Sequence, residues 1–189
     1  MKALRTAMRQ RRATLPRHVV AAHSARIARS LWQLPAMARS QRIAAYLAIA
    51  GEVDCMPFMR AALARGREVY VPRLHGQHLR FAPWHPGAAL VDNRFGIAEP
   101  ALPHDECLHG MQLDVVLMPL VAFDPHGRRL GMGGGFYDRS FAFMRQRPRW
   151  HHPLLIGMAH EFQRVDLLPT QPWDVGLHAV VTEHAVHLF

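Results

Sequence analysis

The chain of 189 residues lacks the features that mark several specialised classes of protein. Its two cysteines, Cys55 and Cys107, lie far apart and outside any C-x-x-C pair, which argues against a disulfide framework or a cysteine zinc site. The longest uncharged apolar run, residues 115–123, is much shorter than the roughly twenty residues that a bilayer helix needs. We therefore expect a cytoplasmic protein that is not embedded in a membrane.

Acidic residues are absent from residues 1–51, which hold ten lysines and arginines. Residues 52–189 hold thirteen basic and fourteen acidic residues, so the net charge of +9 comes from the first quarter of the chain. Three interpretations compete: binding of nucleic-acid phosphates, an organellar transit peptide, and a basic helix that faces an anionic small molecule. Lys2 is the only lysine, so biased codon usage also explains part of the arginine excess.

Predicted helices and strands alternate along the chain. Lys2, Arg5, Arg9 and Arg12 share one face of a predicted helix that Pro16 ends. The hydrophobic pattern predicts further helices over 18–33, 57–64 and 138–145, and strands over 42–49, 68–71, 79–82, 114–118, 154–158 and 179–182. This alternation predicts one α/β domain over residues 1–189, a three-layer α/β/α sandwich with a largely parallel central sheet.

The most informative segment is residues 130–139, LGMGGGFYDR, with four glycines in five positions. Glycine allows backbone N–H groups to approach an anion closely, and the start of a helix adds unpaired N–H groups. The segment therefore predicts phosphate binding, with a tight turn that needs glycine only for its shape as the alternative. Asp138 at the exit of the loop is predicted to bind Mg²⁺, whereas Asp124 is predicted to form a turn.

Other chemistry finds little support in the sequence. The glycine segment lacks the Lys-Ser/Thr of a P-loop and the spacing of a dinucleotide fingerprint. Nothing resembles a Ser-His-Asp triad or a nucleophile elbow. The fourteen histidines are scattered, and we expect them to be surface or core residues rather than metal ligands.

Several motifs together resemble the 5-formyltetrahydrofolate cyclo-ligase family, also called methenyltetrahydrofolate synthetases. The central match is residues 119–139. Further matches follow in the family's order: Lys2 with Leu4-Arg5, Glu52, Val71-Pro72-Arg73, residues 95–100, Gly157-Met158-Ala159 with Gln163, Asp174, and Val181-Thr182-Glu183.

The resemblance implies an ATP- and Mg²⁺-dependent enzyme that converts 5-formyltetrahydrofolate to 5,10-methenyltetrahydrofolate, ADP and phosphate. It implies that Asp138 and Asp174 hold the metal, and that Arg129 and Tyr137 are catalytic. The implied ATP contacts are Lys2, Arg5, Arg129, Leu130, Gly131, Met132, Gly133, Gly134, Gly135, Phe136 and Tyr137. The implied folate contacts are Leu47, Glu52, Met132, Gly133, Gly134, Gly135 and Phe136.

Two positions in the loop depart from the family's pattern. The family usually has Tyr-Tyr where this chain has Phe136-Tyr137, and some members have lysine at the position of Gly134. We expect activity to survive, because Phe136 keeps the aromatic face. The partners expected are a reduced folate and ATP, with no nucleic acid or membrane, and the enzyme is expected to be a monomer. The alternatives are a nucleotide- or RNA-binding module without catalysis, and a related ligase that acts on another formylated substrate.

Overall fold

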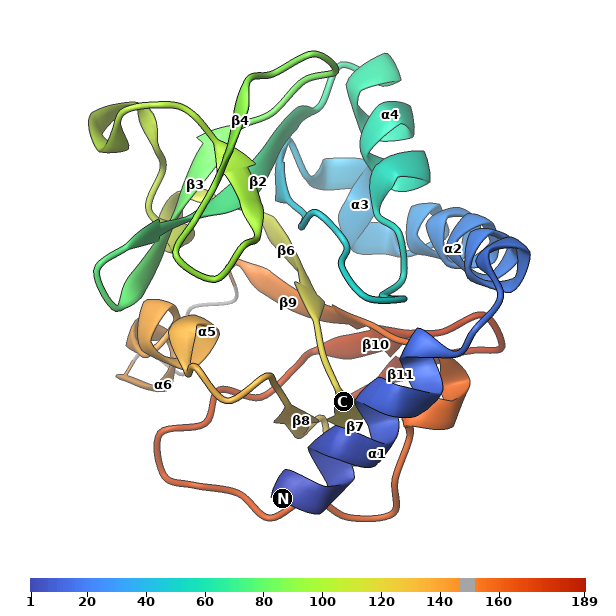
Figure 1. Cartoon of the computed structure of the whole chain (residues 1–189). Helices are drawn as coiled ribbons and strands as arrows, with labels where there is room; N and C mark the ends of the chain where they lie inside the picture. The colour runs from blue at the N-terminus through green and yellow to red at the C-terminus, as the bar shows by residue number, and fades with distance from the viewer. Residues whose placement is uncertain (147–151) are drawn as a thin grey trace.

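The structure is a computed structural model that describes residues 1–146 and 152–189. Its centre is a seven-stranded sheet in the order β11-β10-β9-β6-β1-β2-β3 (Figure 1). The strands are β1 (Arg42–Ala44), β2 (Glu68–His75), β3 (His78–Pro83), β6 (Val115–Pro119), β9 (Leu154–Met158), β10 (Ala179–Val181) and β11 (Val186–Leu188). The five inner strands run parallel, whereas β3 and β11 pair antiparallel at the edges. This topology confirms the predicted α/β fold with a largely parallel sheet.

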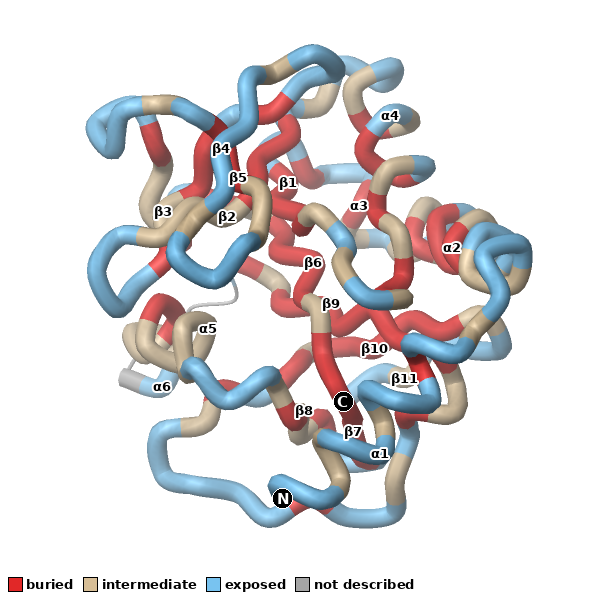
Figure 2. Tube along the Cα trace, viewed as in Figure 1, coloured by how far each residue is buried: buried red, intermediate tan, exposed pale blue. Residues whose placement is uncertain are grey.

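Helices cover both faces of the sheet. One face packs against α2 (Arg17–Trp32), α3 (Pro35–Arg39) and α4 (Met56–Ala64). The other packs against α5 (Phe136–Ser140), α6 (Phe143–Gln146) and the 3₁₀ turn η2 (Gly110–Gln112). Val115 and Leu117 of β6 face the first layer, and Val116 and Met118 face the second, as the alternation of a strand requires. The inner strands are consequently buried on both sides (Figure 2).

Two predicted strands end at least four residues away from their predicted ends. The strand predicted over 42–49 ends at Ala44, and the chain then forms a loop in which the Tyr46 hydroxyl donates to the Val53 carbonyl. The strand predicted over 68–71 continues through Pro72 to His75. Proline is tolerated there because β1 pairs only as far as Tyr70, so the missing N–H group costs no hydrogen bond to that neighbour.

The helix predicted over 138–145 begins earlier and is interrupted. It forms α5 and α6, which are separated by a buried Phe141. The Ser140 hydroxyl donates to the Phe136 carbonyl and accepts from the Leu79 N–H at the start of β3. The end of α5 is therefore fixed by a contact with the sheet that the local sequence does not reveal.

Helix α1 (Lys2–Ala13) has 12 residues, and the other remaining elements are short. They are the β4 (Leu90–Asp92)–β5 (Ala98–Pro100) pair, the β7 (Ala122–Phe123)–β8 (Arg129–Leu130) hairpin, η1 (His104–Glu106) and η3 (Glu161–Gln163). Among the described residues, no helix has the length and apolar character needed to cross a bilayer.

Asp124 forms the turn of the β7–β8 hairpin, as predicted, and it is fully buried. Its Oδ1 accepts from the N–H groups of His126 and Arg128, and its Oδ2 accepts from the Leu168 N–H. Three donors on one carboxylate hold the hairpin that leads into the glycine loop.

Asp124→Ala should lower the free energy of unfolding by about 2–3 kcal/mol, because the buried donors at Asp124 lose their acceptor. Denaturant titration measures this loss. Asp124→Asn is the matched control and should lose less, since its amide oxygen still accepts. An Asp124→Ala protein as stable as the unmodified chain would contradict this role.

Candidate active site

Helix α1 lies beside the β7–β8 hairpin (Figure 1). Leu4 and Met8 pack against the buried side chains of the hairpin. This packing places Arg5 at the glycine loop, where its Nε donates to the Gly131 carbonyl at 2.9 Å. Lys2 is exposed, and its ammonium group has no hydrogen-bond or ion-pair partner among the described residues. The structure thus brings Arg5, but not Lys2, into contact with the loop.

The glycine loop needs glycine for its backbone shape at two positions. Gly133 has φ 104° and Gly135 has φ 63°, in the left-handed region that side chains disfavour. Arg139 donates from Nη2 to the Gly134 carbonyl at 2.6 Å and from Nε to the Gln77 carbonyl at 2.8 Å. The N–H groups of residues 133–135 donate to no acceptor in the described part of the chain. The loop therefore presents free donors on a fixed backbone.

An open depression of about 600 Å³ lies over this loop. Its lining is His78, Gly133, Gly134, Gly135, Asp138, Arg139, Ala142, Arg145 and Trp173. Two arginines and free N–H groups suit a phosphate chain, and a single carboxylate at the edge suits its metal counter-ion.

Asp138 and Arg129 form a close ion pair under the loop. Arg129 Nη2 lies 2.7 Å from Asp138 Oδ1, and the Arg129 side chain is only 6% exposed. Arg129 also donates to the Val175 carbonyl, and the Val175 N–H donates to Asp138 Oδ1 at 3.2 Å. This three-way contact ties β8 and α5 to the segment that precedes β10.

The same contact brings the two predicted metal ligands into neighbouring segments, because Asp174 adjoins Val175. Asp174 Oδ2 accepts from the Gln171 N–H at 2.8 Å. Asp138 Oδ2 and Asp174 Oδ1 have no partner among the described residues. Carboxylate oxygens are the donors that Mg²⁺ prefers, so this donor set fits the ion.

Glu52 is buried in an ion pair with Arg12. Arg12 Nη1 lies 3.2 Å from Glu52 Oε1, and the two side chains are 2% and 7% exposed. The Ile49 N–H donates to Glu52 Oε2, and Arg12 Nε donates to the Ala50 carbonyl. Burial raises the pKa of Glu52, although the Arg12 charge opposes this shift.

The sequence places Arg12 on the basic face of a helix and predicts no role for it. Its spacing from Arg5, two helical turns, was the available signal that both residues face the same side. The turn that contains Gly51 and Glu52 also packs against the backbone of Arg12. Gly51 has φ 75°, and a Cβ at this position would lie 2.4 Å from the Arg12 carbonyl oxygen. Only glycine permits this close approach of the Glu52 turn to α1.

Tyr137 lies in α5 directly after the glycine loop, and its ring lies 6.3 Å from that of Phe141. Burial raises the pKa of Tyr137, the nearby charge of Glu52 raises it further, and Arg129 opposes the shift. Its hydroxyl therefore stays protonated at neutral pH. Phe136 beside it contacts the Phe95 ring, with centroids 5.7 Å apart.

The other residues predicted to contact ATP or the folate differ in how far they are buried. Leu47 is half-buried against the core, Met132 is exposed, and the buried Leu130 packs into the hairpin with α1. The expectation that the histidines are not metal ligands stays a prediction, but His23 and His160 meet Glu183 away from this site.

Comparison with known proteins gives consistent matches. The model of the 5-formyltetrahydrofolate cyclo-ligase family matches residues 1–183. The 5-formyltetrahydrofolate cyclo-ligase of Escherichia coli (strain K12) is 38% identical over 184 residues, which are 95% of this chain and 98% of that protein. The 5,10-methenyltetrahydrofolate synthetase of Aquifex aeolicus superposes with a TM-score of 0.81 at 31% identity, covering 99% of this chain and 91% of that one. The synthetase of Mycoplasma pneumoniae gives a TM-score of 0.74 at 26% identity, covering 96% and 98%.

Proposed function

The chain belongs to the 5-formyltetrahydrofolate cyclo-ligase family, and we propose that it converts 5-formyltetrahydrofolate to 5,10-methenyltetrahydrofolate with consumption of ATP in the presence of Mg²⁺. The observation that carries this proposal is the glycine loop, where free N–H groups of residues 133–135 line one depression together with Asp138, the partner of Arg129.

The phosphates of ATP would lie over the glycine loop. The free N–H groups of residues 133–135 and the Arg5 guanidinium would face them, with Arg139 holding the loop in shape. Asp138 and Asp174 would hold Mg²⁺, which supplies positive charge to the transferring phosphoryl group. Lys2 is the weakest part of this assignment, because it has no contact at the loop.

The folate would bind on the Glu52 side. Glu52 would accept hydrogen bonds from the pterin ring or orient the formyl group, while Leu47, Met132 and Phe136 would supply apolar contact. The buried position of Glu52 suits such a role, because a hydrogen bond to a carboxylate is stronger where water is excluded.

The chemistry requires a better leaving group than a formyl oxygen. In the proposed sequence this oxygen attacks the γ-phosphorus and ADP leaves. Nitrogen 10 then attacks the formyl carbon and releases its proton, and the C–O bond breaks as phosphate departs. Arg129, which is paired with Asp138 beside the glycine loop, and Tyr137 would stabilise the developing charge.

An absorbance assay of methenyltetrahydrofolate formation tests the activity. We expect product from 5-formyltetrahydrofolate only when ATP and Mg²⁺ are both present. Absence of product with correctly folded protein would overturn the proposal, and turnover of other formylated compounds in its place would favour the related-ligase alternative.

The RNA-binding alternative loses its main support in the structure. Arg12 is buried and Arg5 is bonded to the glycine loop, so two of the four residues on the basic face of α1 point into the protein. A single domain, a cytoplasmic location and a monomeric state remain part of the proposal.

A further inference from the structure

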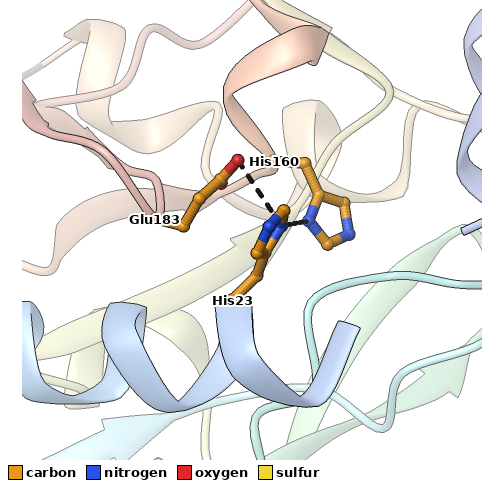
Figure 3. Close-up of side chains that lie close together, drawn as sticks. All are labelled: His23, His160 and Glu183. Atoms are coloured by element: carbon orange, nitrogen blue, oxygen red, sulfur yellow. Dashed lines mark hydrogen bonds and ion pairs between the residues drawn. The ribbon is translucent and has the colours of Figure 1, made fainter. Parts of the chain in front are cut away.

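Three side chains from distant segments converge away from the active site (Figure 3). His23 comes from α2, His160 follows β9, and Glu183 follows β10. His23 Nδ1 lies 2.9 Å from His160 Nδ1 and 3.4 Å from Glu183 Oε1. Within residues 1–146 and 152–189, no other group of three His, Cys, Asp or Glu side chains offers such closely spaced ligand atoms.

Neighbouring groups orient two of these side chains. His160 Nε2 lies 3.0 Å from the Gly51 carbonyl, which only accepts, so this nitrogen carries the hydrogen and Nδ1 presents a lone pair. Glu183 Oε2 accepts from the Glu161 N–H at 3.0 Å, which leaves Oε1 facing His23. Supporting contacts of this kind, from a ring N–H to a backbone carbonyl and from a carboxylate to a donor, typically orient metal ligands.

Without a cation, the cluster is poorly satisfied. His160 Nδ1 and Glu183 Oε1 are both acceptors, and both point at His23 Nδ1, which carries at most one hydrogen. The exposed His184 Nε2 lies 3.6 Å from Glu183 Oε1, which is too far for a hydrogen bond. A cation would satisfy all three lone pairs together. We propose that His23, His160 and Glu183 bind a divalent transition-metal ion of the Zn²⁺ class, whose preferred ligands are imidazole and carboxylate.

The dimensions suit such an ion. Metal–ligand bonds of about 2.0–2.1 Å in a tetrahedron place ligand atoms roughly 3.3–3.4 Å apart. The His23–Glu183 distance already matches, and the two imidazoles need to separate by a few tenths of an ångström. The His23 side chain is 22% exposed and gives the ion a path from solvent.

The bound ion would connect the cluster of His23, His160 and Glu183 to the turn that contains Glu52. Through His160 Nε2 it would hold the Gly51 carbonyl, which adjoins Glu52 and packs against Arg12. The role is structural: it joins α2, β9 and β10 to this turn. The proposal does not depend on the reaction that the enzyme catalyses.

Zn²⁺ titration of the untagged full chain against a competing chelator dye tests the site. We expect one tightly bound Zn²⁺ per chain and a higher melting temperature in its presence. His23→Asn and Glu183→Gln should each weaken binding at least about tenfold. Glu183→Gln keeps the shape of the side chain and replaces a lone pair with an NH₂ donor, so it tests ligation without creating a cavity.

His18→Asn is the matched control, because His18 is an exposed histidine on the same helix. It should leave both the stoichiometry and the affinity unchanged. Circular dichroism checks that every variant is folded. The proposal is overturned if the unmodified chain binds no Zn²⁺ at one equivalent, if His23→Asn and Glu183→Gln bind as tightly as the unmodified chain, or if His18→Asn weakens binding equally.

Discussion

Asp138→Asn should lower kcat/KM by on the order of 100-fold or more, with a weaker apparent affinity for Mg²⁺. The substitution keeps the size of the side chain and the acceptor for the Val175 N–H, but it removes the negative charge that pairs with Arg129. In the proposed site, the same charge holds the ion that faces the phosphates. Initial rates over a series of Mg²⁺ concentrations, at saturating folate and ATP, measure both effects.

Asp166→Asn is the matched control, since Asp166 is exposed and has no hydrogen-bond or ion-pair partner among the described residues. It removes the same charge and should leave the rates unchanged. If Asp138→Asn lowers the rate with an unaltered Mg²⁺ dependence, Asp138 acts only by positioning Arg129. Near-normal rates at every Mg²⁺ concentration would remove Asp138 from the site.

The sheet could be predicted from the sequence because its inner strands are buried on both faces. Continuous apolar runs mark such strands, and the strand over 154–158 has the predicted bounds. The glycine loop was predictable for a similar local reason, since Gly133 and Gly135 adopt backbone angles that side chains disfavour. The short β4, β5, β7 and β8 have too few residues to show a period.

Contacts between distant segments could not be predicted in this way. Arg12 occupies an exposed-looking position in a basic helix, and only the Glu52 turn, forty residues later in the chain, makes it a buried residue. The cluster of His23, His160 and Glu183 combines residues from three distant segments, so no spacing within the sequence predicts it. In both cases the fold creates the site from side chains that are ordinary in their local context.

The Arg12–Glu52 pair leads to the largest expected effect on stability. Arg12→Met should lower the free energy of unfolding by about 3–5 kcal/mol, because it leaves the Glu52 carboxylate buried without its partner. Methionine keeps much of the apolar volume, so the loss reports the charge rather than a cavity. Denaturant titration measures it, and Arg9→Met, an exposed position on the same helix, should change stability little.

Two further measurements separate the ion pair from general damage to α1. Adding Glu52→Gln to Arg12→Met should recover part of the stability, since the double variant buries no unpaired charge.

The loss of stability in Arg12→Met should also depend on pH. Burial raises the pKa of Glu52 above its ordinary value of 4.5, and Arg12 opposes that shift, so removing Arg12 raises the pKa further. A carboxyl group with a raised pKa in the folded state favours folding below its ordinary pKa, and this advantage is lost as the pH rises through the folded value. Arg12→Met should therefore be least destabilised in acid and most destabilised at alkaline pH. A loss that is independent of pH and unaffected by Glu52→Gln would show that Arg12 acts by packing alone.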